Sequence, residues 1–322
     1  MTSPGDRTPL SVRVTQARME AAGVRSLILR RTSGAPVPDW AAGAHIDVLL
    51  PDGTTRQYSL CGEPGTTDHY RIGVLRERDG RGGSRWLHDE VTVGDVLRIR
   101  GPRNHFRLES APGYLFVAGG IGITPILAMI REAEQAGADW RLRYAGRSLG
   151  SMAFVDELTP YDGRVSIQPE DERGRPDVDA LLATVAPDEL VYVCGPTGLI
   201  DAVRNAAERA GLTRRVRYEL FSAPVAGTGD ETAEQGFDVE LLNSGLVLRI
   251  PPDRSVLDVV LAAGVNVISD CQDGICGSCE TEVVAGEPDH RDHVLTPDEQ
   301  QAGTCMMICV SRSLGPRLVL RL

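Results

Sequence analysis

The stretch Cys271-Gln272-Asp273-Gly274-Ile275-Cys276-Gly277-Ser278-Cys279 places three thiols within nine positions, and Cys309 follows after 29 further residues. This spacing matches the four ligands of a plant-type 2Fe–2S cluster. Two sulfide-bridged irons need four thiolates, and three of these can come from one tight loop. Gly274 and Gly277 would let the loop curl around the cluster and direct backbone amides at its sulfurs. The predicted metal ligands are therefore Cys271, Cys276, Cys279 and Cys309.

A structural zinc site and a set of unrelated free thiols are the alternatives to a cluster. A structural zinc site usually carries two short Cys pairs, and only one such pair is present here. Scattered free thiols would not account for five of the seven cysteines lying between Cys271 and Cys309. Either Cys305 or Cys309 could be the fourth ligand, and the longer gap favours Cys309. A disulfide framework is not expected in a cytoplasmic chain.

Length, composition and charge bound the remaining possibilities. A chain of 322 residues with 42% hydrophobic residues predicts two to three globular domains. No apolar run approaches the ~18 residues of a membrane span, and the polar start cannot form a signal peptide, so a cytoplasmic location is expected. The net charge of −11 argues against a nucleic-acid partner. Between Ala233 and Leu322 there are 14 acidic residues and 6 Arg, which suggests docking to a basic patch on a partner protein or simply a solubilising surface.

The first segment, residues 1–107, contains short alternating apolar stretches separated by turn residues such as Pro51-Asp52-Gly53. Repeated short strands separated by such turn residues predict an antiparallel β-barrel. The predicted strands are Ser11–Thr15, Arg25–Arg31, Ala44–Leu50, Arg56–Leu60, His69–Leu75 and Gly94–Arg100.

Strands and helices alternate over residues 108–223, which predicts an α/β domain with a parallel sheet covered on both faces. The expected elements include a helix over Thr124–Gln135, with Thr124 as N-cap, and another over Met152–Leu158. Residues 224–235 are small and polar and indicate a linker. Residues 236–322 begin with a hairpin, followed by a helix and the cysteine loop, and are expected to form an α+β ferredoxin-type domain.

Two motifs point to a nucleotide site in the middle segment. The first, Gly119-Gly120-Ile121-Gly122-Ile123-Thr124-Pro125, lies between a predicted strand and helix, where glycines allow a pyrophosphate to approach free amides. The second, Cys194-Gly195-Pro196, ends another predicted strand. Ligands of open parallel sheets bind at the carboxyl ends of the strands, so both motifs are expected at one edge.

The first segment offers two candidates for a flavin site. Arg56-Gln57-Tyr58-Ser59-Leu60 would place Arg56 and Tyr58 on one face of a strand. Arg81-Gly82-Gly83-Ser84 could cradle a phosphate with backbone amides and a hydroxyl. Taken singly, either could also be an ordinary surface strand or a glycine loop.

The order of these motifs resembles that of the phthalate dioxygenase reductase family, which includes vanillate O-demethylase reductases. The resemblance covers nearly the whole chain and implies FMN rather than FAD, an NAD(P)-binding domain, and electron delivery to a separate oxygenase. It implies the following FMN contacts: Arg56 and Ser84 to the phosphate, Gly82 and Gly83 as close backbone, Tyr58 against the flavin ring, and Ser59 near N5.

The same resemblance implies the nicotinamide side of the site. Gly120, Gly122 and Thr124 would line the nucleotide, together with Gly195 and Pro196, and Cys194 would lie near the reacting nicotinamide. Glu219 and Phe221, from Tyr218-Glu219-Leu220-Phe221, match the family's acidic and aromatic end of the last strand, which closes over the flavin. Arg147 and Ser148 are expected at the adenosine ribose. An acid there would favour NADH, whereas Arg could hold the phosphate of NADPH. No acid follows the strand that ends before Arg147, so NADH is favoured only slightly.

These expectations combine into one function. Nicotinamide supplies two electrons as hydride and an oxygenase metal accepts one at a time, so hydride would pass to FMN and single electrons would continue through the cluster. The partner would be a Rieske-type or haem-thiolate oxygenase, docking transiently at the acidic ferredoxin domain of a monomer. An FAD-containing reductase, and a non-catalytic redox sensor or zinc-stapled binding module, are the alternatives.

Overall fold

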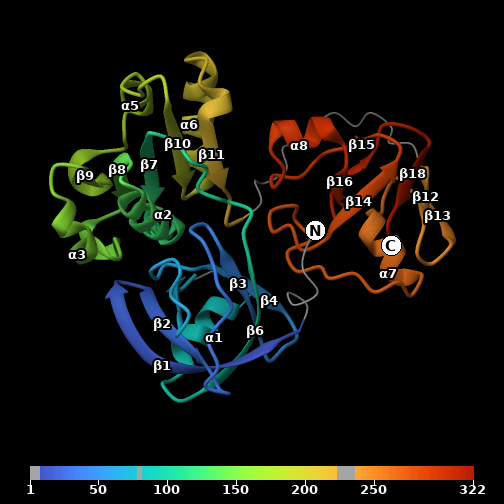
Figure 1. Cartoon of the computed structure of the whole chain (residues 1–322), viewed down its shortest axis with the longest axis horizontal. Helices are drawn as coiled ribbons and strands as arrows, with labels where there is room; N and C mark the ends of the chain where they lie inside the picture. The colour runs from blue at the N-terminus through green and yellow to red at the C-terminus, as the bar shows by residue number, and fades with distance from the viewer. Residues whose placement is uncertain (1–7, 78–81, 223–235) are drawn as a thin grey trace. The chain divides into compact units, whose positions relative to one another are not determined.

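A computed structural model of the protein describes residues 8–77, 82–222 and 236–322. The chain divides into two compact units, Met1–Phe221 and Ser222–Leu322 (Figure 1). The linker predicted over residues 224–235 lies outside the described residues. Each unit is described by itself.

The first unit begins with a six-stranded antiparallel sheet in the order β4-β3-β6-β1-β2-β5. An antiparallel bridge between Leu60, just after β4, and Ile72 of β5 joins the two edge strands and closes the sheet into the predicted barrel. Valines of β1 such as Val12 and Val14 are fully buried inside it. The elements are β1 (Leu10–Ala21), β2 (Val24–Arg31), β3 (His45–Leu49), β4 (Thr55–Ser59), β5 (Tyr70–Leu75), α1 (Gly83–Asp89) and β6 (Val96–Arg103).

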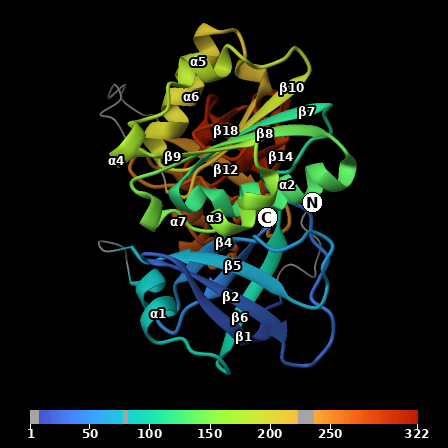
Figure 2. The same cartoon turned by 90° about the vertical axis from the view of Figure 1, so that its left-hand side faces the viewer.

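A five-stranded parallel sheet follows in the order β11-β10-β7-β8-β9. The central strand β7 is buried on both faces, with α5 and α6 above the strands and α2 and α3 below them in Figure 2. Its elements are β7 (Gly113–Gly119), α2 (Ile123–Ala136), β8 (Asp139–Gly146), α3 (Val155–Leu158), β9 (Val165–Pro169), α4 (Glu170–Arg173), α5 (Val178–Leu182), β10 (Glu189–Cys194), α6 (Thr197–Arg209) and β11 (Val216–Glu219).

One cluster of buried apolar side chains continues from the barrel into the parallel sheet. Phe106, which follows β6, packs against Tyr192 of β10 with ring centroids 5.5 Å apart. The Tyr192 hydroxyl also donates a hydrogen bond to the carbonyl of Arg107 (2.9 Å). The barrel and the nucleotide sheet therefore share a core.

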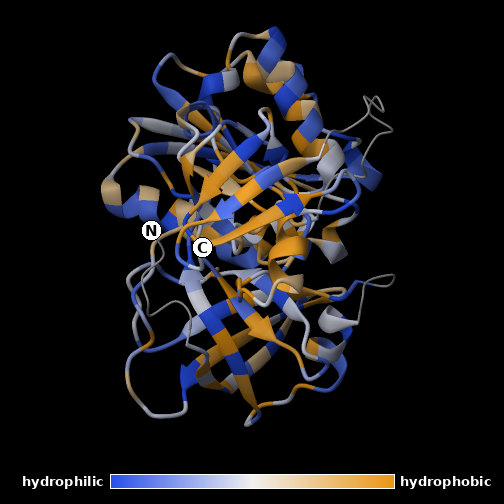
Figure 3. Cartoon of the chain, turned by 90° about the vertical axis from the view of Figure 1, so that its right-hand side faces the viewer, coloured by the Kyte–Doolittle hydropathy of each residue, from blue (hydrophilic) through white to orange (hydrophobic). Residues whose placement is uncertain are grey.

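The second unit has a mixed sheet in the order β13-β12-β18-β14-β16, with β12 parallel to β18 and a small β15–β17 pair. Inward residues of β12, among them Val239 and Leu241, are buried while their neighbours are half-exposed, and Figure 3 shows hydrophobic and hydrophilic residues alternating along strands. The elements are β12 (Phe237–Leu241), β13 (Leu246–Ile250), α7 (Val256–Ala262), β14 (Glu280–Ala285), β15 (Pro288–Asp289), α8 (Pro297–Ala302), β16 (Cys305–Met307), β17 (Arg312–Ser313) and β18 (Arg317–Leu320).

The predicted fold class is confirmed, but two helix predictions are wrong in detail. The helix expected over Met152–Leu158 starts only at Val155, because Phe154 adopts a left-handed backbone with φ 63°. Thr124 is not an N-cap: the chain makes a 3-10 turn over Gly120–Gly122 and α2 begins at Ile123. Among the described residues, no helix is both long and apolar enough to cross a bilayer.

Candidate functional site

Arg56 on β4 is held against the turn that begins α1. One guanidinium nitrogen, Nη1, donates to the carbonyl of Thr55 (2.7 Å), whereas Nη2 is buried without a hydrogen-bond partner among the described residues. A Cβ on Gly83 would lie 2.8 Å from Arg56 Cγ and 2.6 Å from Leu50 Cδ1, so only glycine lets the turn pack this closely. A buried donor without a partner is costly, and an anionic group of a cofactor would satisfy it.

The other two phosphate candidates lie in the same turn. Gly82 has φ 93°, a left-handed conformation that favours glycine, and Ser84 Oγ accepts a hydrogen bond from the Glu77 amide (3.2 Å). Arg81, the first residue of the predicted motif, lies outside the described residues. The turn formed by Gly82, Gly83 and Ser84 thus packs against Arg56 through Gly83, and its amides and hydroxyl are groups that could bind a phosphate.

Tyr58 and Ser59 complete strand β4 at the end that faces the parallel sheet. Burial raises the pKa of the Tyr58 hydroxyl, so this side chain is an uncharged aromatic surface. Ser59 is 5% exposed, and its Oγ donates to Oε2 of Glu219 on β11 (3.5 Å). This contact brings a residue of the predicted flavin site to one from the predicted closing strand.

The two nucleotide motifs lie in contact at the carboxyl edge of the parallel sheet. A Cβ on Gly122 would be 2.3 Å from the carbonyl oxygen of Cys194 and 2.5 Å from the Gly195 nitrogen. A Cβ on Gly195 would in turn lie 2.9 Å from Gly119 Cα, and Pro196 packs on the same glycine. Glycines are therefore required for the two strand ends to meet, independently of any ligand.

Thr124 is the second residue of α2 rather than its cap. Its hydroxyl donates to the carbonyl of Ile121 (2.9 Å), and its side chain is 2% exposed. The methyl group faces the barrel, where a Cβ on Gly73 of β5 would lie only 2.7 Å from Thr124 Cγ2. Thr124 thus connects the nucleotide turn to the barrel wall.

Cys194, Glu219 and Phe221 gather at the ends of β10 and β11, where Cys194 pairs with Glu219 in parallel register. Burial, reinforced by the nearby Glu219 carboxylate, raises the pKa of the Cys194 thiol well above its usual value, so the thiol stays protonated. Burial also raises the pKa of Glu219 to about 8. Phe221 is 42% exposed. This end of the sheet can hold a proton on Glu219 near neutral pH.

Sequence reasoning missed the acids at the adenosine end. Arg147 and Ser148 follow β8, as expected, and Arg147 is exposed. The neighbouring strand β9, whose Pro169 pairs with Gly146, runs directly into Glu170 and Asp171. The amide of Asp171 donates to the Arg147 carbonyl (3.1 Å). Glu170 and Asp171 are therefore candidates for an acid that binds the ribose 2′-hydroxyl of NADH. They follow β9, one strand away from the end of β8 where the sequence suggested such an acid would lie.

A cavity of about 480 Å³ lies between strands β8 and β9 and helix α5. It is lined by Arg141, Arg143, Gln168, Arg173, Arg175, Pro176, Asp177, Ala180, Leu181 and Thr184. Arg141 pairs with Glu189 (2.8 Å) and Arg175 lies 3.8 Å from Glu170, so part of this positive charge is neutralised internally.

The four predicted cluster ligands converge in the second unit. The thiols lie close enough to influence one another: Cys271 acts on Cys276 and Cys309, and Cys279 acts on Cys309. Backbone amides point at sulfur: Asp273 N donates to Cys271 Sγ (3.3 Å) and Ser278 N to Cys276 Sγ (3.4 Å). Among the described residues, no three His, Cys, Asp or Glu side chains form a group that could hold a single metal ion. Thiols, together with backbone amides directed at sulfur, are the groups that a 2Fe–2S cluster uses.

Cys305 lies apart from these contacts. It begins β16 and faces acidic side chains, namely Glu280, Glu299 and Asp292. Burial, followed by these negative charges, raises the pKa of its thiol to about 11. Cys305 therefore does not belong to the group of four thiols at the loop.

The chain is similar to known proteins over its two later domains and over its whole length. Residues 239–314 match the model of the 2Fe-2S iron-sulfur cluster binding domain, and residues 116–205 match that of the oxidoreductase NAD-binding domain. The phenoxybenzoate dioxygenase subunit beta of Ectopseudomonas oleovorans is 42% identical over 100% of both chains. The phthalate dioxygenase reductase of Burkholderia cepacia is 38% identical, again over 100% of both.

A solved structure extends the similarity to a fusion protein. An intact type IV self-sufficient cytochrome P450 monooxygenase matches with a TM-score of 0.92 and 43% identity over 100% of this chain. The present chain covers 42% of that longer protein.

Proposed function

This chain belongs to the phthalate dioxygenase reductase family of NAD(P)H-dependent flavin and 2Fe–2S oxidoreductases, and on that premise we propose that it serves a separate oxygenase, with FMN as its flavin. The observation that carries the proposal is the 3.5 Å contact between Ser59 and Glu219, which joins the flavin strand to the nucleotide sheet. Two cofactors held on these elements would lie within reach of each other.

The flavin would be held by strand β4 and the turn before α1. Arg56 would bind the phosphate through Nη2, which has no hydrogen-bond partner among the described residues, and the hydroxyl of Ser84 and the close backbone of Gly82 and Gly83 would complete that site. Tyr58 would lie against the ring and Ser59 would hydrogen-bond near N5. A bound flavin supplies the conversion between two-electron nicotinamide chemistry and one-electron iron–sulfur chemistry.

The residues of the parallel sheet orient the nicotinamide. Gly120, Gly122, Gly195 and Pro196 provide close backbone at the carboxyl edge, and Thr124 limits the depth of the site. The neutral Cys194 thiol packs near the ring without adding charge, while Glu219 holds a proton on its carboxyl group beside Ser59. Phe221 would cover the opening of the nicotinamide site and keep water out of it.

Four thiolates, from Cys271, Cys276, Cys279 and Cys309, would hold the cluster in the second unit. The acidic surface of that unit would receive a basic patch of a Rieske-type or haem-thiolate oxygenase in a transient complex. The chain is proposed to act as a monomer in the cytoplasm.

Absorption spectroscopy of the purified protein tests the proposal. Flavin bands with a broad iron–sulfur shoulder are expected, and NADH should bleach both under anaerobic conditions. Heat-released flavin should be FMN by chromatography; FAD would overturn the FMN assignment alone. A colourless protein, or one that NADH does not bleach, would contradict the function.

A further inference from the structure

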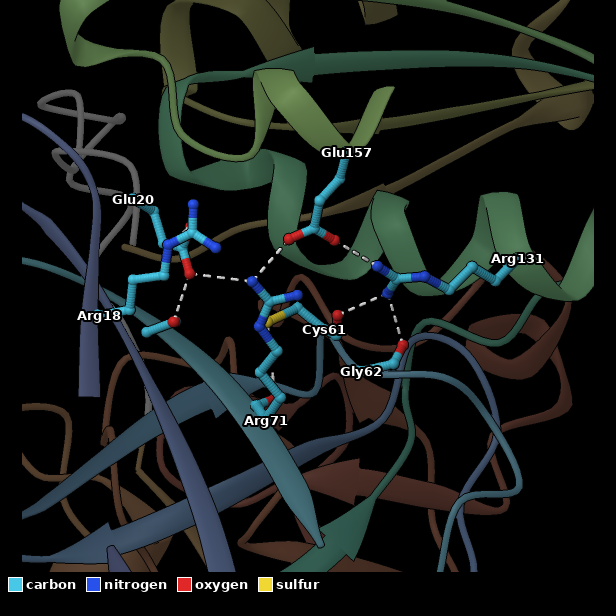
Figure 4. Close-up of polar contacts among 8 residues, drawn as sticks. Arg18, Glu20, Cys61, Gly62, Arg71, Arg131 and Glu157 are labelled. Atoms are coloured by element: carbon cyan, nitrogen blue, oxygen red, sulfur yellow. Dashed lines mark hydrogen bonds and ion pairs between the residues drawn. The ribbon is translucent and has the colours of Figure 1, made fainter. Parts of the chain in front are cut away.

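Four charged side chains form a network between the barrel and the nucleotide sheet of the first unit (Figure 4). Glu157 of α3 accepts one hydrogen bond from Arg71 of β5 and one from Arg131 of α2, both at 2.6 Å. Arg71 also donates to Glu20 of β1 (3.0 Å). The four side chains are only 5–30% exposed, so the pairs are screened less than surface ion pairs.

Arg131 extends the network to the flavin strand. Its Nη1 donates to the carbonyls of Cys61 (2.6 Å) and Gly62 (2.7 Å), which follow directly on the Ser59-Leu60 end of β4. The helix that carries Arg131 begins at Ile123, immediately after the nucleotide turn. One guanidinium therefore links the helix of the nucleotide turn to the strand end beside Ser59.

The packing of Phe154 against Arg71 restricts the position of the Arg71 guanidinium. Its guanidinium lies 4.8 Å from the ring centre of Phe154, and that ring is close to Gly73, where an added Cβ would come within 3.2 Å of Cζ. Phe154 keeps a left-handed φ of 63°, a strained conformation that persists only where its surroundings enforce it. Thr124 also packs against Gly73, next to Phe154, so the network is in packing contact with a residue of the proposed nucleotide site.

We propose that Arg71, Glu157 and Arg131 are positioning residues that fix the distance between the nicotinamide and flavin sites. The inference rests on the proposed function, because it takes the flavin to lie at Ser59 and the nicotinamide at Thr124. Hydride transfer needs reacting atoms about 3–3.5 Å apart, and a displacement of about 1 Å can slow it roughly 100-fold. A role in stability alone would leave the rate of this step unchanged.

The test compares the holoprotein with its Glu157→Gln and Arg131→Gln variants. Glu134→Gln is the matched control, because Glu134 lies on α2 with Arg131 and pairs with Arg164 (2.5 Å), outside the network. The rate constant of flavin reduction at saturating NADH is measured by stopped flow, with the Kd for NADH, the long-wavelength absorption of the stacked nicotinamide–flavin pair, and the unfolding midpoint. Backbone hydrogen exchange of residues 59–62 is measured without NADH.

Both network variants should lose at least about tenfold in the reduction rate constant, while the Kd for NADH changes less than about twofold. The long-wavelength band should weaken and exchange over residues 59–62 should accelerate, whereas the control should match the wild type. If either variant fails to fold, Arg71→Lys replaces it and should show an intermediate loss. An unchanged rate in a folded variant, even with a lowered unfolding midpoint, would overturn the proposal. Failure of the wild type to be reduced would instead remove the proposed function.

Discussion

At the scale of single residues, Glu219 holds an unusual position for a carboxylic acid. It lies at the end of β11, 3.5 Å from the Ser59 hydroxyl and beside the neutral Cys194. Burial raises its pKa to about 8, since low-polarity surroundings disfavour the carboxylate. Below that pH the group is neutral. Above it the group carries a negative charge, and in the proposed site hydride transfer would deliver further negative charge close by.

This order of charge states predicts the pH dependence of flavin reduction. The rate constant at saturating NADH should be steady from about pH 6 to 7 and fall as the pH rises through about 8. A unit charge about 5 Å away costs roughly 1–3 kcal/mol, so the rate constant should fall by about 5- to 160-fold. Glu219→Gln cannot ionise and should keep its rate through this range in stopped-flow measurements. A wild-type profile that stays flat well above the pKa of Glu219 would contradict the assignment.

The cysteines make a second prediction at this scale. Cys309→Ser should lose the cluster, because it removes one of four converging thiols, whereas Cys305→Ser should keep it. The measurement is iron and acid-labile sulfide per chain, with two of each expected for a 2Fe–2S centre in the wild type and in Cys305→Ser. The reverse pattern would make Cys305 the fourth ligand.

Sequence reasoning anticipated which residues lie together where local spacing encodes their proximity. The cysteine spacing predicted which thiols would converge, and the glycine motifs predicted where two strand ends would meet. It failed for Thr124, because the 3-10 turn over Gly120–Gly122 starts the helix earlier than a capping pattern indicates. It could not find the network of Arg71, Glu157 and Arg131, since nothing in their spacing shows that three distant residues meet.

At the scale of elements, the carboxyl edge formed by β8 and β9 is where we propose that the two coenzymes are distinguished. Glu170 and Asp171 follow β9 next to Arg147, and carboxylates there would bind a free ribose 2′-hydroxyl and repel a 2′-phosphate. NADH should therefore be preferred over NADPH by roughly 100-fold in kcat/KM, equivalent to about 3 kcal/mol. In the Glu170→Gln/Asp171→Asn variant, the ratio of kcat/KM for NADH to kcat/KM for NADPH should decrease by about tenfold.

Steady-state kinetics with both coenzymes check this prediction. Asp162→Asn is the matched control, since Asp162 lies before the amino end of β9, and it should leave the ratio unchanged. A wild-type preference for NADPH would contradict the prediction and would instead make Arg173 and Arg175, at the neighbouring cavity, the candidates for binding the phosphate.

Element boundaries depended on contacts that are not local. The helix expected from Met152 is cut short because Phe154 turns its ring toward Gly73 and Arg71. Helix α8 was missed although its signals are present: Thr296 and Glu299 form a capping box and Pro297 occupies the first turn. Strand and helix types followed from periodicity, while their ends were set by tertiary packing.

At the scale of the whole molecule, the division into two units separates hydride chemistry from one-electron delivery. The first unit shares one core and is tied together by ion pairs, which suits a reaction that requires fixed geometry. The second unit has its own core. Its charge is concentrated as well, with 14 acidic residues and 6 Arg from Ala233 onward. Electron delivery by this unit should therefore respond to salt, whereas flavin reduction should not.

The salt response can be measured without the native oxygenase. Reduction of a basic one-electron acceptor such as cytochrome c should slow severalfold between about 50 and 300 mM salt, because screening shortens the reach of opposite charges to about 10 Å near 0.1 M. The anionic acceptor ferricyanide should show no such decrease. Asp273→Asn/Glu280→Gln, which neutralises two exposed acids at the cluster loop, should weaken the salt dependence more than Asp253→Asn in the turn before α7. If the wild type and both variants show the same salt dependence, the docking charge lies elsewhere on the unit. If the wild type shows no salt dependence, electrostatic docking to this acceptor is excluded.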